Sequence, residues 1–348
     1  MILVFDMDGV ITSEQVYWDT AATVVDEIWI GPKGSIPPIT PSLIAEIKSL
    51  AINSNWDLAY LFLGCVLIAW SRKYPDISFL AGPSRHHRFT FHGGMDLPGS
   101  RNIDASEIVR ILMSFSGVNG VALLQAIGTE LDCRLPWSEG KFAFGGEEYR
   151  RLHARCQELH MQKFEYEQKS GQEIPAVDID QLQKLFAELA SSDAVQLGIA
   201  TGRRRSEALR ALAQFELKSF FAEDRIVGYD DILAAQETLE KSGIATNLTK
   251  PHPYSILRAA FVSETPRELM SRRVENASEL VYVGDGVSDV LAAKAAGAFS
   301  VGVLTGIPDE CDFKVAKRRQ LLSAGCDCVL SSVLDLGQAF DLLRERNI

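Results

Sequence analysis

The stretch that decides the fold is Ile2-Leu-Val-Phe-Asp-Met-Asp-Gly9, almost at the start of the chain. Its first four residues are apolar and partly β-branched, which predicts a short buried strand, and the polar residues that follow end that strand. Asp6 and Asp8 therefore come where a strand passes into a loop. Ligands of an open parallel sheet bind at the carboxyl ends of its strands, so we expect both carboxylates at such an edge.

Similar apolar runs recur in the second half of the chain, and two of them also end in polar residues, Thr201 and Asp285. Helix-like segments separate the runs. Strands that alternate with helices indicate βαβ units, so we predict an α/β fold with a Rossmann-like, doubly wound, mostly parallel sheet. The predicted strands are 195–200, 280–283, 299–303 and, more weakly, 328–330, and the predicted helices are 204–217, 254–262, 287–296 and 333–346.

The region from 13 to 188 has a different pattern, with several helical segments and few strand-like runs. In 147–167, apolar residues recur at spacings of three and four, which is typical of a helix with one buried face. We therefore predict that a large, mainly helical domain, 13–188, is inserted into an α/β core made of 1–12 and 189–348. The other helices predicted there are 39–54, 58–74 and 105–115, and 75–101 is predicted to be a long loop.

The composition limits the classes of partner. The 348 residues include 35 Lys and Arg against 46 Asp and Glu, a formal net charge of −11, and 47% are hydrophobic, which suits a folded globular protein. The acidic balance argues against a nucleic-acid partner, because a phosphate backbone requires a basic surface. No apolar run reaches the roughly 18 residues of a membrane span, so no membrane partner is expected. Scattered cysteines and the lack of a signal peptide favour a cytoplasmic protein with reduced thiols.

Four carboxylates are expected to meet at one edge of the sheet, those of Asp6, Asp8, Asp285 and Asp289. That many negative charges cannot share a poorly solvated site without compensation, and Mg²⁺, which prefers oxygen ligands, is the natural partner. Lys250 lies in a predicted turn just before a helix and can supply a further positive charge. Carboxylates with a metal and a lysine suit phosphoryl transfer, in which a carboxylate can also act as the nucleophile.

Four separated motifs, in this order, resemble those of the haloacid dehalogenase-like hydrolases, and specifically the phosphatases of that superfamily. They are Asp6-Met-Asp-Gly-Val, Thr201-Gly-Arg, Lys250-Pro-His-Pro and Gly284-Asp-Gly-Val-Ser-Asp289. The resemblance covers 1–12 and 190–348. In relatives with an insertion between the first and second motifs, among them phosphoglycolate phosphatases, the insertion is a cap that closes over the site and selects the substrate. By this resemblance, 13–188 is expected to be a cap domain.

The resemblance implies a role for each of the catalytic candidates. Asp6 is the nucleophile that attacks phosphorus, and Asp8 protonates the leaving alcohol and then activates water. Thr201 hydrogen-bonds the phosphoryl oxygens, and Lys250 balances charge between Asp6 and the phosphate. The dehalogenase and phosphonate-cleaving branches lack the aspartate found here at position 8, so its presence favours a phosphatase.

The resemblance also implies Mg²⁺ as the cofactor. Asp6 and Asp285 are expected to bind the ion, together with the backbone carbonyl of Asp8. Asp289 is expected to act one step further out, through a water molecule or on Lys250.

Further residues are candidates for contact with the substrate. The resemblance implies that backbone amides near Met7 and Gly202 donate to the phosphate. Arg203, close to Thr201, can attract an anionic substrate, whereas a solvated helix face suits 204–205 equally well.

The inserted region contributes a polar cluster, Asn53-Ser-Asn-Trp-Asp57, within an otherwise apolar stretch. A similar cluster in the caps of some relatives implies that Asn55 and Trp56 contact the substrate, and a helix cap with a packed aromatic ring is the alternative. A second feature is Arg85-His-His-Arg88 with His92. For this segment a solvated loop is favoured over an anion-binding lid or a zinc site.

We therefore predict Mg²⁺-dependent hydrolysis of a small phosphorylated metabolite, a phosphate monoester, through an aspartyl-phosphate intermediate. Phosphoglycolate and sugar phosphates are the substrates that the resemblance suggests. A phosphomutase, which shares all four motifs, and a non-catalytic phosphate-binding or scaffold protein are the alternatives. A monomer and a homodimer are both open.

Overall fold

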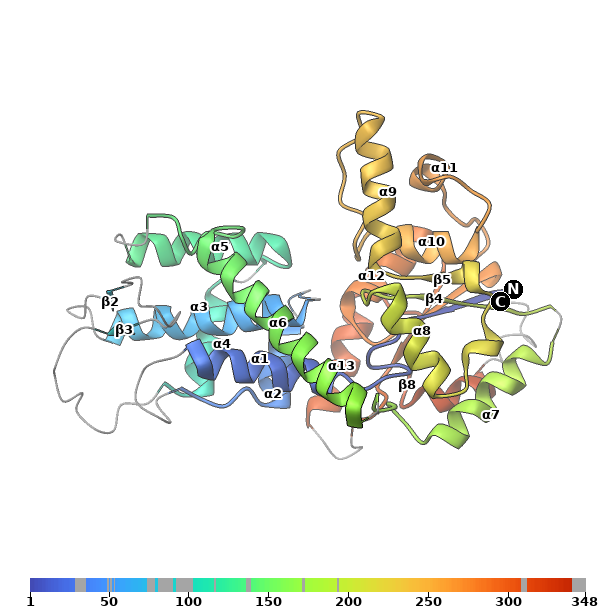
Figure 1. Ribbon diagram of the computed structural model, residues 1–348, viewed down its shortest axis with the longest axis horizontal. Helices are drawn as coiled ribbons and strands as arrows, with labels where there is room; N and C mark the ends of the chain where they lie inside the picture. Colours follow the sequence, from blue (N-terminus) through green and yellow to red (C-terminus); the bar gives the residue numbers. More distant parts are fainter. Residues whose placement is uncertain are drawn as a thin grey trace. The chain divides into compact units, whose positions relative to one another are not determined.

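The chain divides into two compact units, Met1–Glu14 with Gly171–Ile348, and Gln15–Ser170. The first contains a β-sheet and is called the sheet unit; the second is called the helical unit (Figure 1). The structure is a computed structural model, and it describes residues 1–28, 36–48, 50, 52, 54–73, 79–80, 90–91, 103–115, 117–135, 139–170, 173–192, 194–307 and 312–339.

The sheet unit is built on six strands in the order β5-β4-β1-β6-β7-β8, and every neighbouring pair is parallel. The chain runs from β1 outward to β4 and β5 and then returns to the other side of β1 for β6. A reversal of this kind leaves a crevice at the carboxyl ends of the central strands. The strands are β1 (Ile2–Phe5), β4 (Gln196–Ala200), β5 (Ile226–Val227), β6 (Leu280–Gly284), β7 (Phe299–Val303) and β8 (Cys328–Leu330).

Helices cover both faces of this sheet, which confirms the predicted doubly wound α/β fold. Because side chains alternate along a strand, Leu3 and Phe5 of β1 enter one apolar cluster and Val4 enters the other. Helices α7 and α8 supply the first cluster and α9 to α12 supply the second. The helices are α7 (Ile179–Ala190), α8 (Arg205–Gln214), α9 (Tyr229–Lys241), α10 (Tyr254–Ala260), α11 (Pro266–Ser271), α12 (Val287–Ala296) and α13 (Asp312–Ser323).

The helical unit is organised around α3 (Asn55–Lys73), which packs against α1, α2, α4, α5 and α6. Every residue of α3 from Leu58 to Trp70 is buried, as expected for a helix that is apolar on all sides. No helix among the described residues is long and apolar enough to cross a membrane. The remaining elements are α1 (Gln15–Ile28), α2 (Pro41–Lys48), α4 (Ala105–Ser114), α5 (Val121–Arg134), α6 (Glu147–Ser170) and an antiparallel pair of short strands, β2 (Phe79–Leu80) and β3 (Thr90–Phe91).

The predicted end of the insertion, at residue 188, is wrong, because the helical unit ends at Ser170, before α7 begins. The chain returns to the sheet unit at Gly171. The apolar side of α7, including Leu182 and Phe186, packs into the same cluster as Leu3 and Phe5, so burial of that helix face assigns it to the sheet.

Other expectations differ from the structure or fall outside it. The predicted helix 39–54 is shorter, because α2 ends at Lys48 and α3 begins at Asn55. Strands β2, β3 and β5 and helices α1, α5, α7, α9, α11 and α13 were not predicted. Most of the predicted loop 75–101, with Arg85-His-His-Arg88 and His92, lies outside the described residues, as do Asn53 and the end of the predicted helix 333–346.

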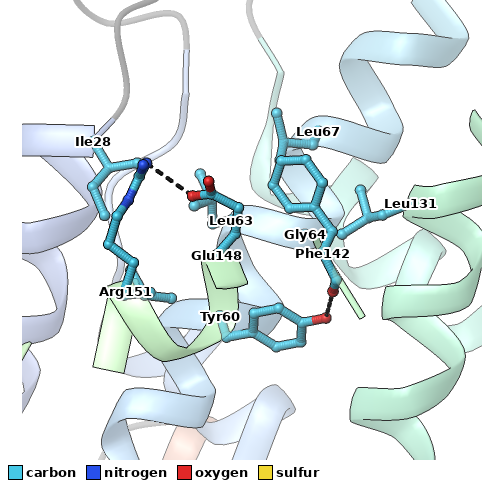
Figure 2. Close-up of a pocket in the computed structure, with 10 residues that line it drawn as sticks. Ile28, Tyr60, Leu63, Gly64, Leu67, Leu131, Phe142, Glu148 and Arg151 are labelled. Atoms are coloured by element: carbon cyan, nitrogen blue, oxygen red, sulfur yellow. Dashed lines mark hydrogen bonds and ion pairs between the residues drawn. The ribbon is translucent and has the colours of Figure 1, made fainter. Parts of the chain in front are cut away.

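A small cavity lies inside the helical unit (Figure 2). Its lining is mostly apolar, from residues such as Leu63, Leu67 and Leu131, and the Tyr60 hydroxyl on its wall donates to the carbonyl of Phe142. The volume is about 10 Å³, close to the minimum needed for one water molecule. The cavity is therefore a gap in the packing and has no room for a metabolite.

Candidate active site

Asp6 lies at the carboxyl end of β1, in the centre of the sheet. Its backbone N–H donates to the carbonyl of Val283, 2.9 Å away, which extends the β1–β6 pairing by one residue. Its carboxylate accepts from the Met7 amide at 2.8 Å through Oδ1 and pairs with Lys250 Nζ at 2.9 Å through Oδ2. The side chain is only 14% exposed, so this carboxylate has little access to bulk water.

Lys250 bridges Asp6 and a second carboxylate, Asp289, whose Oδ1 is also 2.9 Å from Nζ. Asp289 is close to fully engaged, because its Oδ1 lies 3.2 Å from the Tyr282 hydroxyl and its Oδ2 accepts from the Gly286 amide at 2.9 Å. Asp289, the third residue of α12, therefore holds the lysine through one carboxylate oxygen. Its other oxygen accepts from an amide at the start of that helix.

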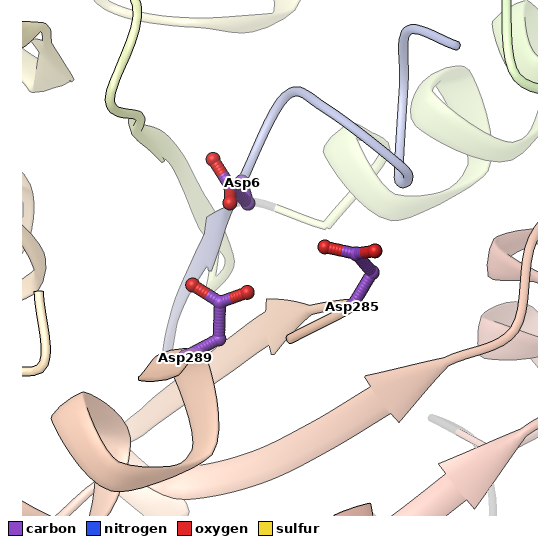
Figure 3. Close-up of side chains that lie close together, drawn as sticks. All are labelled: Asp6, Asp285 and Asp289. Carbon is purple, nitrogen blue, oxygen red and sulfur yellow. The ribbon is translucent and has the colours of Figure 1, made fainter. Parts of the chain in front are cut away.

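Asp285 follows β6 directly and completes an acidic group with Asp6 and Asp289 (Figure 3). Each of the three offers a carboxylate oxygen, and the three oxygens lie within 4.8 Å of one another. The loop after β1 approaches Asp285 so closely that a Cβ at Gly9 would lie 2.5 Å from its Cγ, and Gly9 also has a φ of +71°. Glycine at this position is therefore required both by the space and by the backbone.

Burial and neighbouring charges shift the pKa values of Asp6 and Lys250. Burial raises the pKa of the Asp6 carboxyl to about 7, with Asp289 and Asp8 adding to the rise and Lys250 opposing it. For Lys250, burial alone would lower the pKa of the ammonium, but Asp289 and Asp6 outweigh it and the pKa is raised. The lysine therefore stays charged, and the negative charge around Asp6 remains only partly compensated.

The carboxylate of Asp8 does not join this acidic group, which corrects the expectation that four carboxylates converge. It pairs instead with Arg203, whose Nη2 lies 2.6 Å from Asp8 Oδ1. Arg203 is 6% exposed and makes a second ion pair with Glu173, at 3.0 Å. A guanidinium engaged by two carboxylates is not available to a phosphate, so the structure also corrects the expected substrate contact of Arg203.

The remaining phosphate-binding candidates follow the neighbouring strand. Pairing of Phe5 with Ile199 puts Asp6 level with Ala200, the last residue of β4, so Thr201 follows one residue further along the neighbouring strand. Thr201 is buried, and its hydroxyl oxygen accepts from the Arg203 amide at 3.2 Å. A Cβ at Gly202 would meet nothing within 4 Å. The Met7 amide, by contrast, already donates to Asp6.

Comparison with known proteins gives a match to one family model. The model described as haloacid dehalogenase-like hydrolase matches residues 147–303, which contain the Thr201, Lys250 and Asp285 motifs. The match spans less than half of the 348 residues, and over that part the chain is similar to haloacid dehalogenase-like hydrolases.

One curated protein and one solved structure are similar to this chain. "Putative pyrophosphatase PpaX" of Caldanaerobacter subterraneus subsp. tengcongensis is 28% identical over 157 residues, which are 42% of this chain and 59% of that protein. The chain thus matches less than two thirds of that relative. The X-ray structure of Northeast Structural Genomics Consortium target ZR25 is 22% identical, covers 99% of each chain and has a TM-score of 0.63, which shows a shared fold.

The candidates in the helical unit have structural partners of their own. Ser54 caps α3 by accepting from the amides of Trp56 and Asp57 at 3.2 and 3.3 Å. The Trp56 ring packs against Tyr17 and His160, with centroid distances of 5.9 and 5.6 Å. These contacts fit the alternative of a helix cap with a packed aromatic ring.

Asn55 is the exception in this cluster. Its Oδ1 is buried and has no hydrogen-bond partner among the described residues. A substrate contact for Asn55 and Trp56 therefore stays a prediction.

Among the residues at the site that the sequence analysis missed are Lys317 and Glu173. Lys317 of α13 pairs with Asp285, and Glu173 pairs with Arg203. Neither stands in a motif, and both are single charged residues in polar surroundings. No pattern in the chain indicates which of its many lysines and glutamates reaches the strand ends.

Proposed function

We propose that the protein hydrolyses a small-molecule phosphate monoester in a Mg²⁺-dependent reaction with an aspartyl-phosphate intermediate at Asp6. The observation that carries this proposal is the position of the Asp6 carboxylate. It stands at a strand end, buried, in contact with one lysine and within an acidic group. A carboxylate in that setting can serve as a nucleophile toward phosphorus while its neighbours balance the charge of the phosphate.

The donor set of the site fits Mg²⁺. Asp6 and Asp285 offer carboxylate oxygens, which are the ligands that this hard cation prefers. Asp289 is occupied by Lys250 and the Gly286 amide, which supports a role without direct contact to the ion. When bound, Mg²⁺ would offset the negative charge of the phosphate and of the carboxylates. By likeness to the family, the backbone carbonyl of Asp8 would be a further ligand.

Each residue of the site would then have a separate role. Asp6 attacks phosphorus, and Asp8 gives a proton to the departing alcohol and takes one from the water that later releases phosphate. Lys250 holds Asp6 in place and offsets the phosphate charge. Thr201, with the amide of Gly202, would hold phosphoryl oxygens beside β4.

The substrate class is part of the proposal. Phosphoglycolate and sugar phosphates, which are monoesters, follow from the family resemblance. Inorganic pyrophosphate, a phosphoanhydride outside that class, is added to the panel because a similar protein is named a pyrophosphatase. We propose a small phosphorylated metabolite as the partner, with neither nucleic acid nor a membrane involved, and the cytoplasm as the location. The five described cysteines, which are free thiols, support a reducing compartment.

Release of inorganic phosphate from a panel of these compounds, with Mg²⁺ and after chelation with EDTA, tests the proposal. We expect turnover with Mg²⁺ that EDTA abolishes and added Mg²⁺ restores. A phosphomutase would interconvert two sugar phosphates and release little phosphate, which product analysis detects. No turnover of any compound or of p-nitrophenyl phosphate at any Mg²⁺ concentration would instead identify a non-catalytic protein.

A further inference from the structure

We propose that Arg203 is a positioning residue that orients the carboxylate of Asp8 for proton transfer, and that Glu173 holds Arg203 in place. The inference rests on the proposed function, in which Asp8 protonates the leaving group. It assigns a role to a buried set of charges that the family motifs leave unexplained.

The contact between Arg203 and Asp8 has the geometry of a fork. Nε lies 3.0 and 3.1 Å from the two oxygens of Asp8, and Nη2 lies 2.6 Å from Oδ1. A planar guanidinium that binds a carboxylate through two nitrogens fixes the plane of that carboxylate as well as its distance. Thr12 adds a third contact, because its hydroxyl donates to Asp8 Oδ1 at 3.0 Å.

Glu173 fixes the other side of the same guanidinium. Its oxygens lie 3.0 and 3.1 Å from Arg203 Nη1, and Arg210 of α8 contacts it at 3.3 Å. The backbone of Glu173 is tied to the side chain of Gln214, which both donates to its carbonyl at 3.0 Å and accepts from its amide at 2.9 Å. Helix α8 therefore holds Glu173 at two points, the side chains of Arg210 and Gln214.

Burial explains why this arrangement is stiff. The Arg203 side chain is 4% exposed and that of Glu173 is 13% exposed, whereas that of Asp8 is 22% exposed. Arg210, whose side chain is 34% exposed, adds a second guanidinium on Glu173, so the buried carboxylates are not left without cations. Among Asp8, Arg203 and Glu173, the most accessible side chain is that of Asp8, the one that has to reach a substrate.

Glu173 also lies where the chain re-enters the sheet unit. The Ser13 amide donates to the Ile174 carbonyl and the Ala176 amide donates to the Ile11 carbonyl, both at 2.9 Å. Thr12 and Glu173, which contact Asp8 and its arginine, therefore belong to two paired segments. The orientation of Asp8 is thereby tied to both segments at which the chain leaves and rejoins the sheet unit.

A leaving-group comparison separates positioning from a purely structural role. p-Nitrophenolate departs readily without a proton, whereas phenolate from phenyl phosphate depends more on the acid, and kcat/KM reports the step in which the leaving group departs. Arg203→Lys keeps the charge but loses the fork. We expect kcat/KM for phenyl phosphate to fall about 10- to 100-fold further than for p-nitrophenyl phosphate. Arg204→Lys, the same change at the exposed neighbouring position, is the matched control and should leave both values near wild type.

The role of Glu173 is tested with Glu173→Gln. This variant keeps the shape of the side chain and its ability to hydrogen-bond, so we expect it to fold even if Arg203→Lys proves unstable. We expect the same selective loss, smaller in size. In an Asp8→Asn background, Arg203→Lys should add no further leaving-group selectivity, because the group that it orients is gone. Equal losses for both esters in each single variant would overturn the inference and indicate a structural role. Wild-type protein that cleaves neither ester would overturn the proposed function itself.

Discussion

The sheet unit and the helical unit bury polar side chains in different ways. At the ends of β1 and β6, Asp6, Asp285 and Asp289 share two lysines, and the negative charge is only partly balanced. In the helical unit, Asp57 is satisfied by its neighbours, since the Tyr149 hydroxyl donates to it at 2.7 Å and His153 Nε2 lies 2.9 Å away.

The difference follows from geometry. Parallel strands end together, so polar residues that follow them face one another across a crevice and depend on a ligand or an ion for full compensation. Polar residues in a bundle face neighbouring helices, which can supply partners directly, as they do for Asp57 but not for the buried Asn55 Oδ1. The sheet unit therefore gathers several charges at one place, whereas Asp57 of the helical unit contacts single polar side chains of a neighbouring helix.

The same substitution in each unit tests this contrast, and the first gives the largest expected effect. Asp6→Asn removes the proposed nucleophile, and we expect kcat to fall on the order of 10⁴-fold or more, with the fold retained by circular dichroism. Steady-state phosphate release measures it. Turnover within tenfold of wild type would mean that Asp6 is not the nucleophile.

Lys250→Met removes the cation between Asp6 and Asp289. Buried carboxylates left without a partner destabilise a protein strongly, so we expect the free energy of unfolding to fall by about 3 kcal/mol in urea titrations. Mg²⁺ should restore more stability to this variant than to wild type, because the ion replaces part of the lost charge. An equal Mg²⁺ effect in both proteins would argue against the shared site.

Asp57→Asn is the counterpart in the helical unit. It weakens a charged contact with Tyr149, and we expect a loss of about 1 to 2 kcal/mol in stability with kcat nearly unchanged. Tyr149→Phe, which removes only the donor, is the matched variant. A selective rise in KM with unaltered stability would instead support a substrate contact near Asp57. It would contradict the proposed difference between the two units.

The raised pKa of Asp6 predicts a pH-dependent affinity for Mg²⁺. Only the deprotonated carboxylate binds the ion, and burial raises its pKa to about 7, so protons compete with Mg²⁺ as the pH falls. We expect the apparent affinity to fall about tenfold between pH 8 and pH 6, measured by calorimetry. An affinity that is constant over this range would show that Asp6 is not a ligand.

Lys317→Met gives the smallest expected effect. Lys317 pairs with Asp285, so Mg²⁺ has to displace it, and the variant should bind Mg²⁺ about two- to fivefold more tightly. Lys314→Met, in the same helix but paired with the carbonyl of Ile307, is the control. Weaker binding in Lys317→Met would mean that the lysine supports the site.

Much of the fold could be read from residue patterns because those patterns are local. The apolar runs that became β1, β4, β6 and β7 and the apolar stretch of α3 carry the information for their own burial. Strand β5, with two residues, is too short to produce such a pattern. Helix α7 was not predicted, and its assignment to the sheet unit depended on which unit covers its apolar face.

What the sequence by itself determined was where charged and polar side chains gather, since Asp6, Thr201 and Asp285 each follow a strand directly. The tertiary structure alone decided which charges became partners. Asp8 and Arg203 are 195 positions apart, and Arg203 and Glu173 are joined only because α8 and the returning chain meet at one edge of the sheet. Ion pairs of this kind depend on distance in space, which no local spacing encodes.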